Sequence, residues 1–328
     1  YRRKGSFYEN VRPVYLELAE LLMVHAEKLH DDTSRESNLR RVMNTMELLK
    51  IAELEDYFED ECVITRPERT LKPEDMPSHT AVIYPILFPD HLSLLLILPD
   101  GMRHVSVPVD SEKFRRDAER FRDRLQKFSK MSRILHYAKP LYEQLIRPAE
   151  AELTARKIDT LIFAPDGVLR LIPFSALYDG RHFLIEKYAV VTVPSVTLTD
   201  SGPVPLENAR ALLNGLSQGR TEAGRNFSSL PAIREELKSI QRLMDGKTLI
   251  DREYTADNLR NEFRNHAYSV LHIATHGVFG GEPENTFLLT YNSRLSMDYL
   301  GRLIDIGRFR ERPVELLTLS ACQTAQGD

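Results

Sequence analysis

Short apolar runs alternate with helical patterns along most of the second half of this chain, and that alternation limits its possible folds more than any other feature. The strand-like runs cover residues 160–164, 188–193, 209–216, 269–275 and 314–320. One helical pattern follows Pro231 and carries Ile233, Leu237, Ile240 and Leu243. Thr255 is placed to cap another helix. Buried strands that alternate with helices predict a doubly wound, mainly parallel α/β sheet.

Two amphipathic helices begin the chain and predict an N-terminal helical hairpin. Their apolar stripes are Val14, Leu18, Leu21, His25 and Leu29, and then Leu39, Val42, Met46 and Leu49. Polar residues 31–34 separate the stripes and supply helix caps. Such a pair buries little by itself, so we expect it to end a longer helical array or to dock on the next domain.

A small antiparallel β meander is predicted after the helices. Arg66-Pro67 and Lys72-Pro73 indicate a linker, and strand-like runs then cover residues 80–87, 92–98 and 105–109. Further helices begin at Lys113. We therefore expect three parts, namely a helical region at 1–60, the meander with its helices at 61–150, and the main α/β domain at 151–328.

Charge and cysteine content exclude several classes of function. The net charge is −4, which gives no general attraction to nucleic acid. The densest basic stretch, residues 113–133, reads as a helix with a solvated basic face, and its apolar stripe is Phe114, Ala118, Phe121, Leu125 and Phe128. No apolar run approaches the roughly 20 residues of a membrane span. Two cysteines make neither a disulfide framework nor a four-thiolate zinc site, and they fit a reducing, cytoplasmic location.

Two strand-like runs end in residues that can carry chemistry. His276 follows the run at residues 269–275, and Cys322 follows the run at residues 314–320. The stretch between them exceeds the roughly dozen residues that a right-handed crossover needs. The two strands are therefore expected to be neighbours, with His276 and Cys322 at the same edge of the sheet. A histidine beside a cysteine is the arrangement of a thiol nucleophile and its general base.

The neighbouring residues suit that chemistry. An imidazole can accept the proton of a thiol, which is mostly protonated at neutral pH. Gly277 allows a tight turn and the close approach of a substrate carbonyl. The backbone N–H groups of Gly277 and Cys322 are candidates for an oxyanion hole.

Other interpretations of these residues remain open at this point. His272 and His276 would share a face of a helix and could bind a metal ion there, but their surroundings favour a strand, along which four residues span roughly 13 Å. We interpret His272 as a core group or as a group that supports the site. Cys322 could instead be a buried core thiol. Cys62 has no candidate partner and is interpreted as structural.

The two motifs resemble the signature motifs of CHAT domains, which belong to the caspase and separase clan of cysteine peptidases. The motifs read LHIATHG at residues 271–277 and LSACQT at residues 319–324. The segments APDGVLRLIPFSAL at 164–177 and LSMD at 295–298 are similar to further parts of that family. The resemblance runs from about Val82 to the end, and the preceding helices resemble the last tetratricopeptide-like helices that precede many CHAT domains.

The resemblance implies a caspase-like fold and peptide-bond hydrolysis through a thioester, with Cys322 as nucleophile and His276 as base. It implies no metal or organic cofactor, a protein substrate, and a regulatory protein partner that binds the N-terminal helices. Family members continue well past the cysteine motif. We therefore expect a further C-terminal segment, either missing or present as a separate chain that completes the domain. The opening residue Tyr1 likewise predicts an upstream segment.

Two other functions fit the same residues. One is a catalytically silent CHAT-type binding or scaffold module that retains the fold without turnover. The other is an acyl hydrolase that uses the same pair of residues on small amides or esters. Reaction of Cys322 with a peptidyl electrophile, dependent on His276, would distinguish an enzyme from a scaffold.

Overall fold

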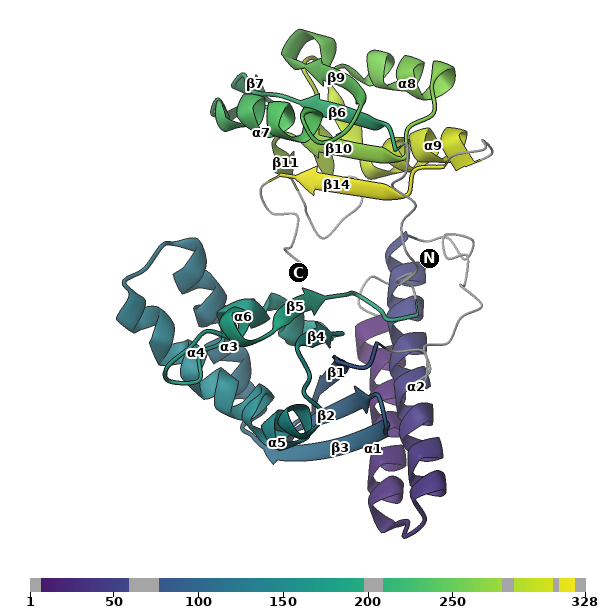
Figure 1. Ribbon diagram of the computed structural model, residues 1–328, viewed down its shortest axis with the longest axis vertical. Coiled ribbons are helices and arrows are strands. Elements are labelled where there is room, and N and C mark those ends of the chain that lie inside the picture. Colours follow the sequence, from purple (N-terminus) through teal and green to yellow (C-terminus); the bar gives the residue numbers. More distant parts are fainter. Residues whose placement is uncertain (1–6, 59–76, 198–208, 279–285, 309–312, 322–328) are drawn as a thin grey trace. The chain divides into compact units, whose positions relative to one another are not determined.

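The computed structural model describes residues 7–58, 77–197, 209–278, 286–308 and 313–321. The chain divides into two compact units, residues 1–201 and 202–328, and each contains its own sheet (Figure 1). No helix among the described residues is long and apolar enough to cross a membrane. The predicted linker at residues 66–73 lies outside the described residues.

The first unit is a mixed five-stranded sheet between two groups of helices. Its helices are α1 (Arg12–Lys28), α2 (Asp32–Phe58), α3 (Ser111–Gln126), α4 (Met131–Leu145), α5 (Glu150–Ala155) and α6 (Leu184–Lys187). Its strands are β1 (Thr80–Leu87), β2 (His91–Leu98), β3 (Gly101–Pro108), β4 (Thr160–Phe163) and β5 (Ala189–Thr192). The strand order is β3-β2-β1-β4-β5, with an antiparallel meander β1-β2-β3 and with β4 and β5 parallel to β1. The predicted meander is confirmed, and it continues into the parallel strands.

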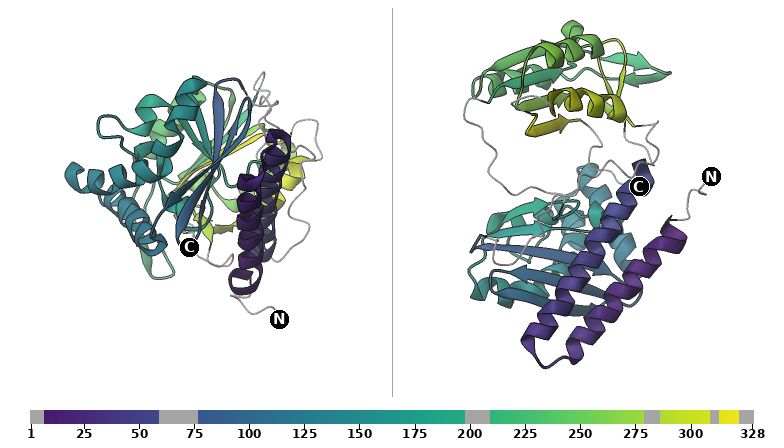
Figure 2. Two further views of the ribbon diagram at one scale, coloured as in Figure 1. Left: turned by 90° about the horizontal axis from the view of Figure 1, so that it is seen from below. Right: turned by 90° about the vertical axis from the view of Figure 1, so that its right-hand side faces the viewer.

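The sheet of the first unit is covered on both faces (Figure 2, left). Successive residues of a strand point to opposite faces, and β1 shows this directly. Ala81 and Ile83 join the core that contains α3, α4 and α5. Val82 and Tyr84 join the core that contains α1 and α2. The helical hairpin therefore docks on the sheet and shares its core.

The predicted stripe of α1 is largely the exposed side of that helix. Leu18 and Leu21 are 45% and 68% exposed. The buried residues of α1 are Ala19, Leu22, Met23 and Ala26, which belong to the core with α2 and the sheet. Because α1 is apolar on two sides, its periodicity predicts the helix but does not distinguish the inner side from the outer one.

A polar cluster lies buried between α2 and the sheet. The Lys50 ammonium donates to the carbonyl of Ala164 at 3.0 Å and pairs with Glu47 at 3.5 Å. Glu47 also accepts hydrogen bonds from the Tyr84 hydroxyl at 2.9 Å and from the Thr197 N–H at 2.9 Å. Burial would raise the pKa of Glu47, but the Lys50 charge and the hydrogen bonds outweigh it and hold that pKa below its ordinary value. This cluster connects α2 to the segment that follows β5.

The second unit is a parallel sheet with helices on both faces. Its helices are α7 (Ala232–Gln241), α8 (Ala256–Asn265) and α9 (Met297–Arg308). Its parallel strands are β6 (Ala211–Gly215), β9 (Gly246–Ile250), β10 (Val270–Ala274) and β14 (Leu316–Ser320), in the order β14-β10-β6-β9. Ile233 and Leu237 of α7 pack on one face, and Leu259 and Phe263 of α8 pack on the other.

This arrangement confirms the doubly wound, mainly parallel sheet of the predicted fold class. The chain passes from β6 to β9 on one side, then crosses to β10 and β14 on the other. Binding sites in such sheets lie at the carboxyl ends of the strands where the winding direction reverses, here beside β6 and β10. Short antiparallel strands complete the unit, namely β7 (Arg220–Glu222), β8 (Arg225–Phe227), β11 (Gly277–Val278), β12 (Phe287–Leu289) and β13 (Arg294–Ser296).

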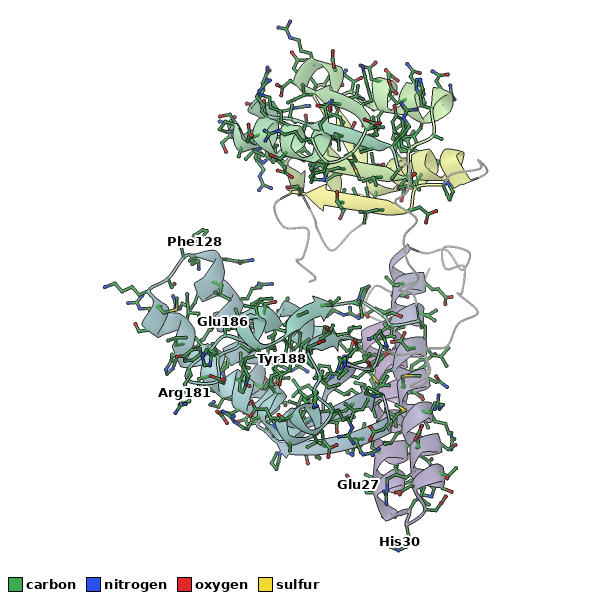
Figure 3. All side chains as sticks on the ribbon, in the orientation of Figure 1. Glu27, His30, Phe128, Arg181, Glu186 and Tyr188 are labelled. Atoms are coloured by element: carbon green, nitrogen blue, oxygen red, sulfur yellow. The ribbon has the colours of Figure 1, made fainter. Side chains whose placement is uncertain are left out.

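Two predicted helical stripes extend too far. The predicted stripe of α3 includes Phe128, but α3 ends at Gln126 and Phe128 is 95% exposed (Figure 3). Its φ of 47° is left-handed, so the helix cannot continue through it. The predicted stripe of α7 includes Leu243, but α7 ends at Gln241 and Leu243 is 85% exposed. In both cases the periodicity continues past the end of the helix.

Candidate active site

The first motif and the described part of the second, residues 319–321, lie at the carboxyl ends of β10 and β14. These strands pair in parallel, and Ala274 of β10 lies opposite Ser320 of β14. The N–H of Thr275 donates to the carbonyl of Ser320 at 3.1 Å, so the pairing extends to the strand ends. His276 follows Ala274 by two residues, just as Cys322 follows Ser320 by two residues in the sequence. The predicted adjacency of the strands is confirmed, while Cys322 lies outside the described residues.

The ring of His276 is held by the loop that precedes α7. Its Nε2 donates to the backbone carbonyl of Ser228 at 2.7 Å, and the ring packs against Phe227 with the centroids 5.2 Å apart. A carbonyl oxygen only accepts hydrogen bonds, so Nε2 carries the proton. In the neutral ring Nδ1 is then the basic nitrogen. His276 is 9% exposed, and its orientation is therefore fixed by packing as well as by this hydrogen bond.

The turn that carries His276 is fixed on its other side by β12. The Thr275 hydroxyl donates to the carbonyl of Leu289 at 2.7 Å, and the Leu289 N–H donates to the carbonyl of His276 at 2.9 Å. Gly277 begins β11 and lies opposite Leu288 of β12. The backbone on both sides of His276 is therefore held in place. The assignment of the Gly277 and Cys322 N–H groups to an oxyanion hole stays a prediction.

His272 lies within β10, where both of its ring nitrogens have partners. Nε2 is 3.0 Å from Oε1 of Glu236 on α7, and Nδ1 is 2.5 Å from the hydroxyl of Thr318 on β14. A carboxylate only accepts hydrogen bonds, so Nε2 carries a proton and donates it to Glu236. His272 therefore connects β10, β14 and α7. Its predicted role in support of the site remains a prediction.

Sequence reasoning missed a buried carboxylate at the ends of β6 and β9. Asp251 follows β9 with a φ of 51°, a conformation that aspartate tolerates better than most residues. Its carboxylate accepts from the N–H of Ser217 at 2.7 Å and the N–H of Gln218 at 3.2 Å, and it pairs with Arg234 of α7. These contacts fix the start of the loop that leads to Ser228. The sequence signal was only an aspartate directly after a strand.

A cavity of about 440 Å³ lies beside these strand ends. Its walls are residues 229–233 and Glu236 at the beginning of α7, Thr275 after β10, and residues 319–321 at the end of β14. The volume is within the usual range of small-molecule and side-chain sites. Thr275 and Ala321, which line the cavity, directly precede His276 and Cys322 in the sequence.

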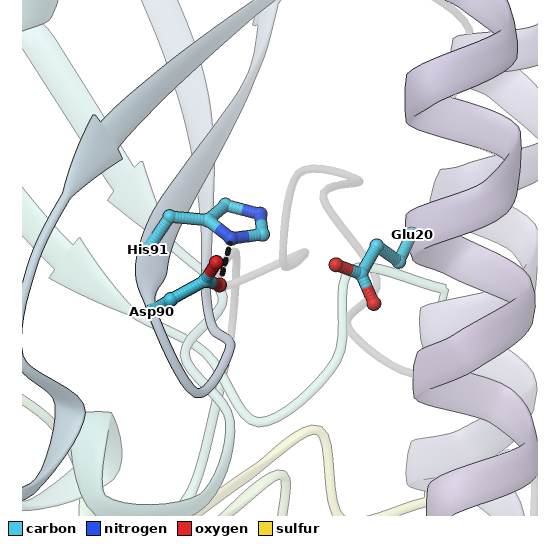
Figure 4. Close-up of side chains that lie close together, drawn as sticks. All are labelled: Glu20, Asp90 and His91. Carbon is cyan, nitrogen blue, oxygen red and sulfur yellow. Dashed lines mark hydrogen bonds and ion pairs between the residues drawn. The ribbon is translucent and has the colours of Figure 1, made fainter.

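One group of three described residues could hold a metal ion, and it lies in the first unit. Glu20 of α1 faces Asp90 and His91 at the turn between β1 and β2 (Figure 4). Nδ1 of His91 donates to Asp90 at 2.8 Å, and this hydrogen bond holds the pKa of Asp90 below its ordinary value. The Asp90 side chain is 86% exposed. These contacts are explained by a polar turn at the surface.

The second unit, with its parallel sheet and a fixed histidine after a central strand, has the features of the caspase-like class of α/β proteins. The CHAT domain family matches residues 135–328, more than half of the chain. The chain therefore belongs to the CHAT family, a caspase-like family. The match begins within α4 and so spans the division between the two units. No curated protein matches the chain. The hairpin of α1 and α2 precedes the matched region, and its tetratricopeptide-like character and the predicted divisions at residues 60 and 150 remain predictions.

Proposed function

We propose that this chain is a cysteine endopeptidase that hydrolyses peptide bonds of a protein substrate, with Cys322 as nucleophile and His276 as general base. The orientation of His276 carries the proposal. Ser228 holds the proton on Nε2 and leaves Nδ1 as the base. The in-register pairing of β10 and β14 supports a position for Cys322 at the same edge of the sheet.

The chemistry proceeds in two balanced stages. Nδ1 of His276 accepts the thiol proton of Cys322, and the thiolate attacks the carbonyl carbon of the scissile bond. The N–H groups of Gly277 and Cys322 stabilise the resulting oxyanion. The C–N bond then breaks, and the imidazolium gives its proton to the leaving amine. Water, deprotonated by His276, hydrolyses the thioester and restores the thiol.

A protein partner that binds the N-terminal helices is the second part of the proposal. Val14, Leu18, Leu21 and Val24 of α1 are exposed apolar residues at helical spacing, and the exposed Val11 directly precedes the helix. Glu17 and Glu27 are exposed on the same helix. The partner that fits is an amphipathic helix whose apolar face is flanked by basic residues. Because α1 and α2 share a core with β1, a regulatory role is tested by changes of exposed residues rather than by deletion of the helices.

The direct test of the peptidase function is cleavage of a peptide library by the full chain, followed by mass spectrometry. We expect cleavage by the wild type and a loss of at least about 10⁴-fold in kcat/KM for Cys322→Ala. Cys62→Ala is the matched control, since it removes the other thiol, and it should retain activity. The Cys322→Ala change should alter stability by no more than about 2 kcal/mol.

The outcomes separate the alternatives. Full activity of Cys322→Ala would refute the assignment of the nucleophile. Hydrolysis of small esters without cleavage of any peptide would favour an acyl hydrolase. An inert thiol and no cleavage would favour a scaffold.

The regulatory role of α1 is tested with the double variant Leu18→Ser and Leu21→Ser. This variant should abolish stimulation by a partner and leave basal cleavage unchanged. Retained stimulation would refute that role for α1.

A further inference from the structure

The cavity beside the strand ends is placed to receive one side chain of a bound peptide. Thr275 and Ala321 line it, and these residues directly precede His276 and Cys322. In a peptide attacked at a carbonyl carbon, the nearest side chain belongs to the residue immediately before the scissile bond, only one carbon away from that carbonyl. A cavity whose walls include the neighbours of both candidate catalytic residues is therefore suited to that side chain.

The walls of the cavity are mainly apolar and contain one charged residue. Leu230, Pro231, Ile233 and Leu319 supply apolar surface. Ser229, Thr275 and Ser320 supply hydroxyl groups. Among the residues that line the cavity, Glu236 alone carries a charged side chain. A side chain that fills the cavity thus meets apolar surface along its length and a single carboxylate.

Glu236 is held at the cavity wall through one of its two carboxylate oxygens. Oε1 accepts from Nε2 of His272 at 3.0 Å, and the second ring nitrogen of His272 lies 2.5 Å from the hydroxyl of Thr318. His272 therefore orients the carboxylate of Glu236. The Glu236 side chain is 34% exposed, which leaves part of it accessible.

No neighbouring cation on α7 competes for Glu236 among the contacts of the described residues. Arg234, two positions earlier, donates instead to Asp251 and to Ser217. Ala232 and Ile240, one helical turn before and after Glu236, carry no charge. The carboxylate is therefore a fixed negative group at a mainly apolar wall.

We propose that Glu236 makes this cavity select lysine or arginine immediately before the scissile bond. This inference rests on the proposed peptidase function and specifies its substrate class. The methylene stem of lysine or arginine can cover the apolar walls while the cationic head pairs with the carboxylate. An acidic side chain would be repelled. A neutral side chain would bury part of the carboxylate without a partner, which is unfavourable.

The test compares two peptide substrates that differ only at the residue before the scissile bond, which is arginine in one and norleucine in the other. With the full-length wild type we expect kcat/KM to favour arginine by about 100-fold. Glu236→Gln preserves the shape of the side chain and removes its charge. We expect the variant to lower the arginine-to-norleucine ratio at least about 10-fold, because cleavage of the arginine peptide falls while cleavage of the norleucine peptide persists.

The control is Glu235→Gln, which removes the adjacent acidic residue that pairs with Arg242 at the surface. It should leave the ratio unchanged. Equal loss on both peptides in Glu236→Gln would mean that Glu236 only supports the site through His272, and that result overturns the selectivity inference. A wild type that cleaves peptides with no preference for lysine or arginine also overturns it. If Cys322 reacts with neither an arginyl nor a norleucyl peptide electrophile and no peptide is cleaved, the proposed peptidase function fails, and the inference fails with it.

Discussion

The central strands of the first sheet and the last strand of the second sheet differ in how they are covered. In β1 and β2 nearly every residue is buried, because helices lie on both faces of that sheet. In β14 no residue reaches the fully buried class, and Leu316 and Leu317 are 41% and 37% exposed. Yet β14 is the strand that leads directly to Cys322. The strand that carries the candidate chemistry is thus less covered than the strands that carry the scaffold.

The buried polar groups of the two units differ in a similar way. In the first unit, Lys50 and Glu47 are deeply buried, and they contact one another and neighbouring scaffold groups. In the second unit, His276 has one ring nitrogen held by a carbonyl and leaves the other as the basic nitrogen. A buried polar group whose hydrogen bonds are satisfied stabilises a scaffold. A histidine whose orientation is fixed through one ring nitrogen can use the other nitrogen for proton transfer.

The largest expected effect on catalysis distinguishes His276 from His272 in the second unit. His276→Ala removes the proposed base and should lower kcat/KM by roughly 10³-fold or more. His272→Ala removes only the connection between Glu236 and Thr318, so its loss should be about 10-fold. Rate measurements on both variants, with circular dichroism as a control for folding, check this prediction. An active His276 variant beside an inert His272 variant would reverse the two roles.

The next prediction tests the difference in burial between β2 and β14 by making the same Leu→Ala substitution in each strand. Leu94→Ala in β2 removes a side chain that is fully buried between the sheet and its helices. It should lower the free energy of unfolding of the first unit by about 3 kcal/mol. Leu316→Ala in the half-exposed β14 should cost less than about 1 kcal/mol. Denaturant titration with hydrogen exchange resolved to each sheet measures both values. Equal costs would show that β14 is as firmly packed as β2.

The next expected loss of stability is smaller than that of Leu94→Ala and concerns the buried pair of Glu47 and Lys50 in the first unit. Glu47→Gln leaves the Lys50 ammonium without its anionic partner, while the amide retains some of the hydrogen bonds. We expect a loss of about 2 kcal/mol in the free energy of unfolding at neutral pH. Glu17→Gln at the surface of α1 is the control and should have almost no effect.

The pH dependence of this loss follows from the lowered pKa of Glu47. The unfolded chain binds the proton of Glu47 at a higher pH than the folded chain does. The stabilisation by the carboxylate is therefore complete above the ordinary glutamate pKa of about 4.3 and is lost as the pH falls through the lower folded value. The difference between wild type and Glu47→Gln should shrink in that acidic range. A difference that stays constant with pH would contradict the account.

The sequence predicted the strands of the second unit well because their apolar runs are short and separated by clear helical patterns. Neighbouring positions for β10 and β14 followed from the crossover length, and the pairing of Ala274 with Ser320 agrees with this prediction. The support for His276 was not predictable, because Ser228 contributes only a backbone carbonyl, which every residue possesses. Asp251 was missed for a related reason, since its role depends on a left-handed conformation and on loops that fold back to it.

The sequence does not show which side of α1 faces outward, and the reason is different. Its exposed stripe and its buried residues are both apolar, so periodicity establishes a helix without establishing its orientation. The same limit applies at Phe128 and Leu243, where apolar residues continue the spacing after the helix has ended. A spacing pattern records which residues could be buried together. Only the tertiary structure determines which of them are.

The most direct test of Cys322 and His276 as a catalytic pair is the reaction of the full chain with a peptidyl acyloxymethyl ketone, followed by intact mass measurement and peptide mapping. We predict one adduct, located on Cys322, with Cys62 unmodified. In His276→Ala the reaction should be at least about 100-fold slower, because the thiolate is no longer generated by an adjacent base. Absence of an adduct, equal labelling of Cys62, or an unchanged rate in His276→Ala would contradict the assignment of Cys322 and His276 as a catalytic pair.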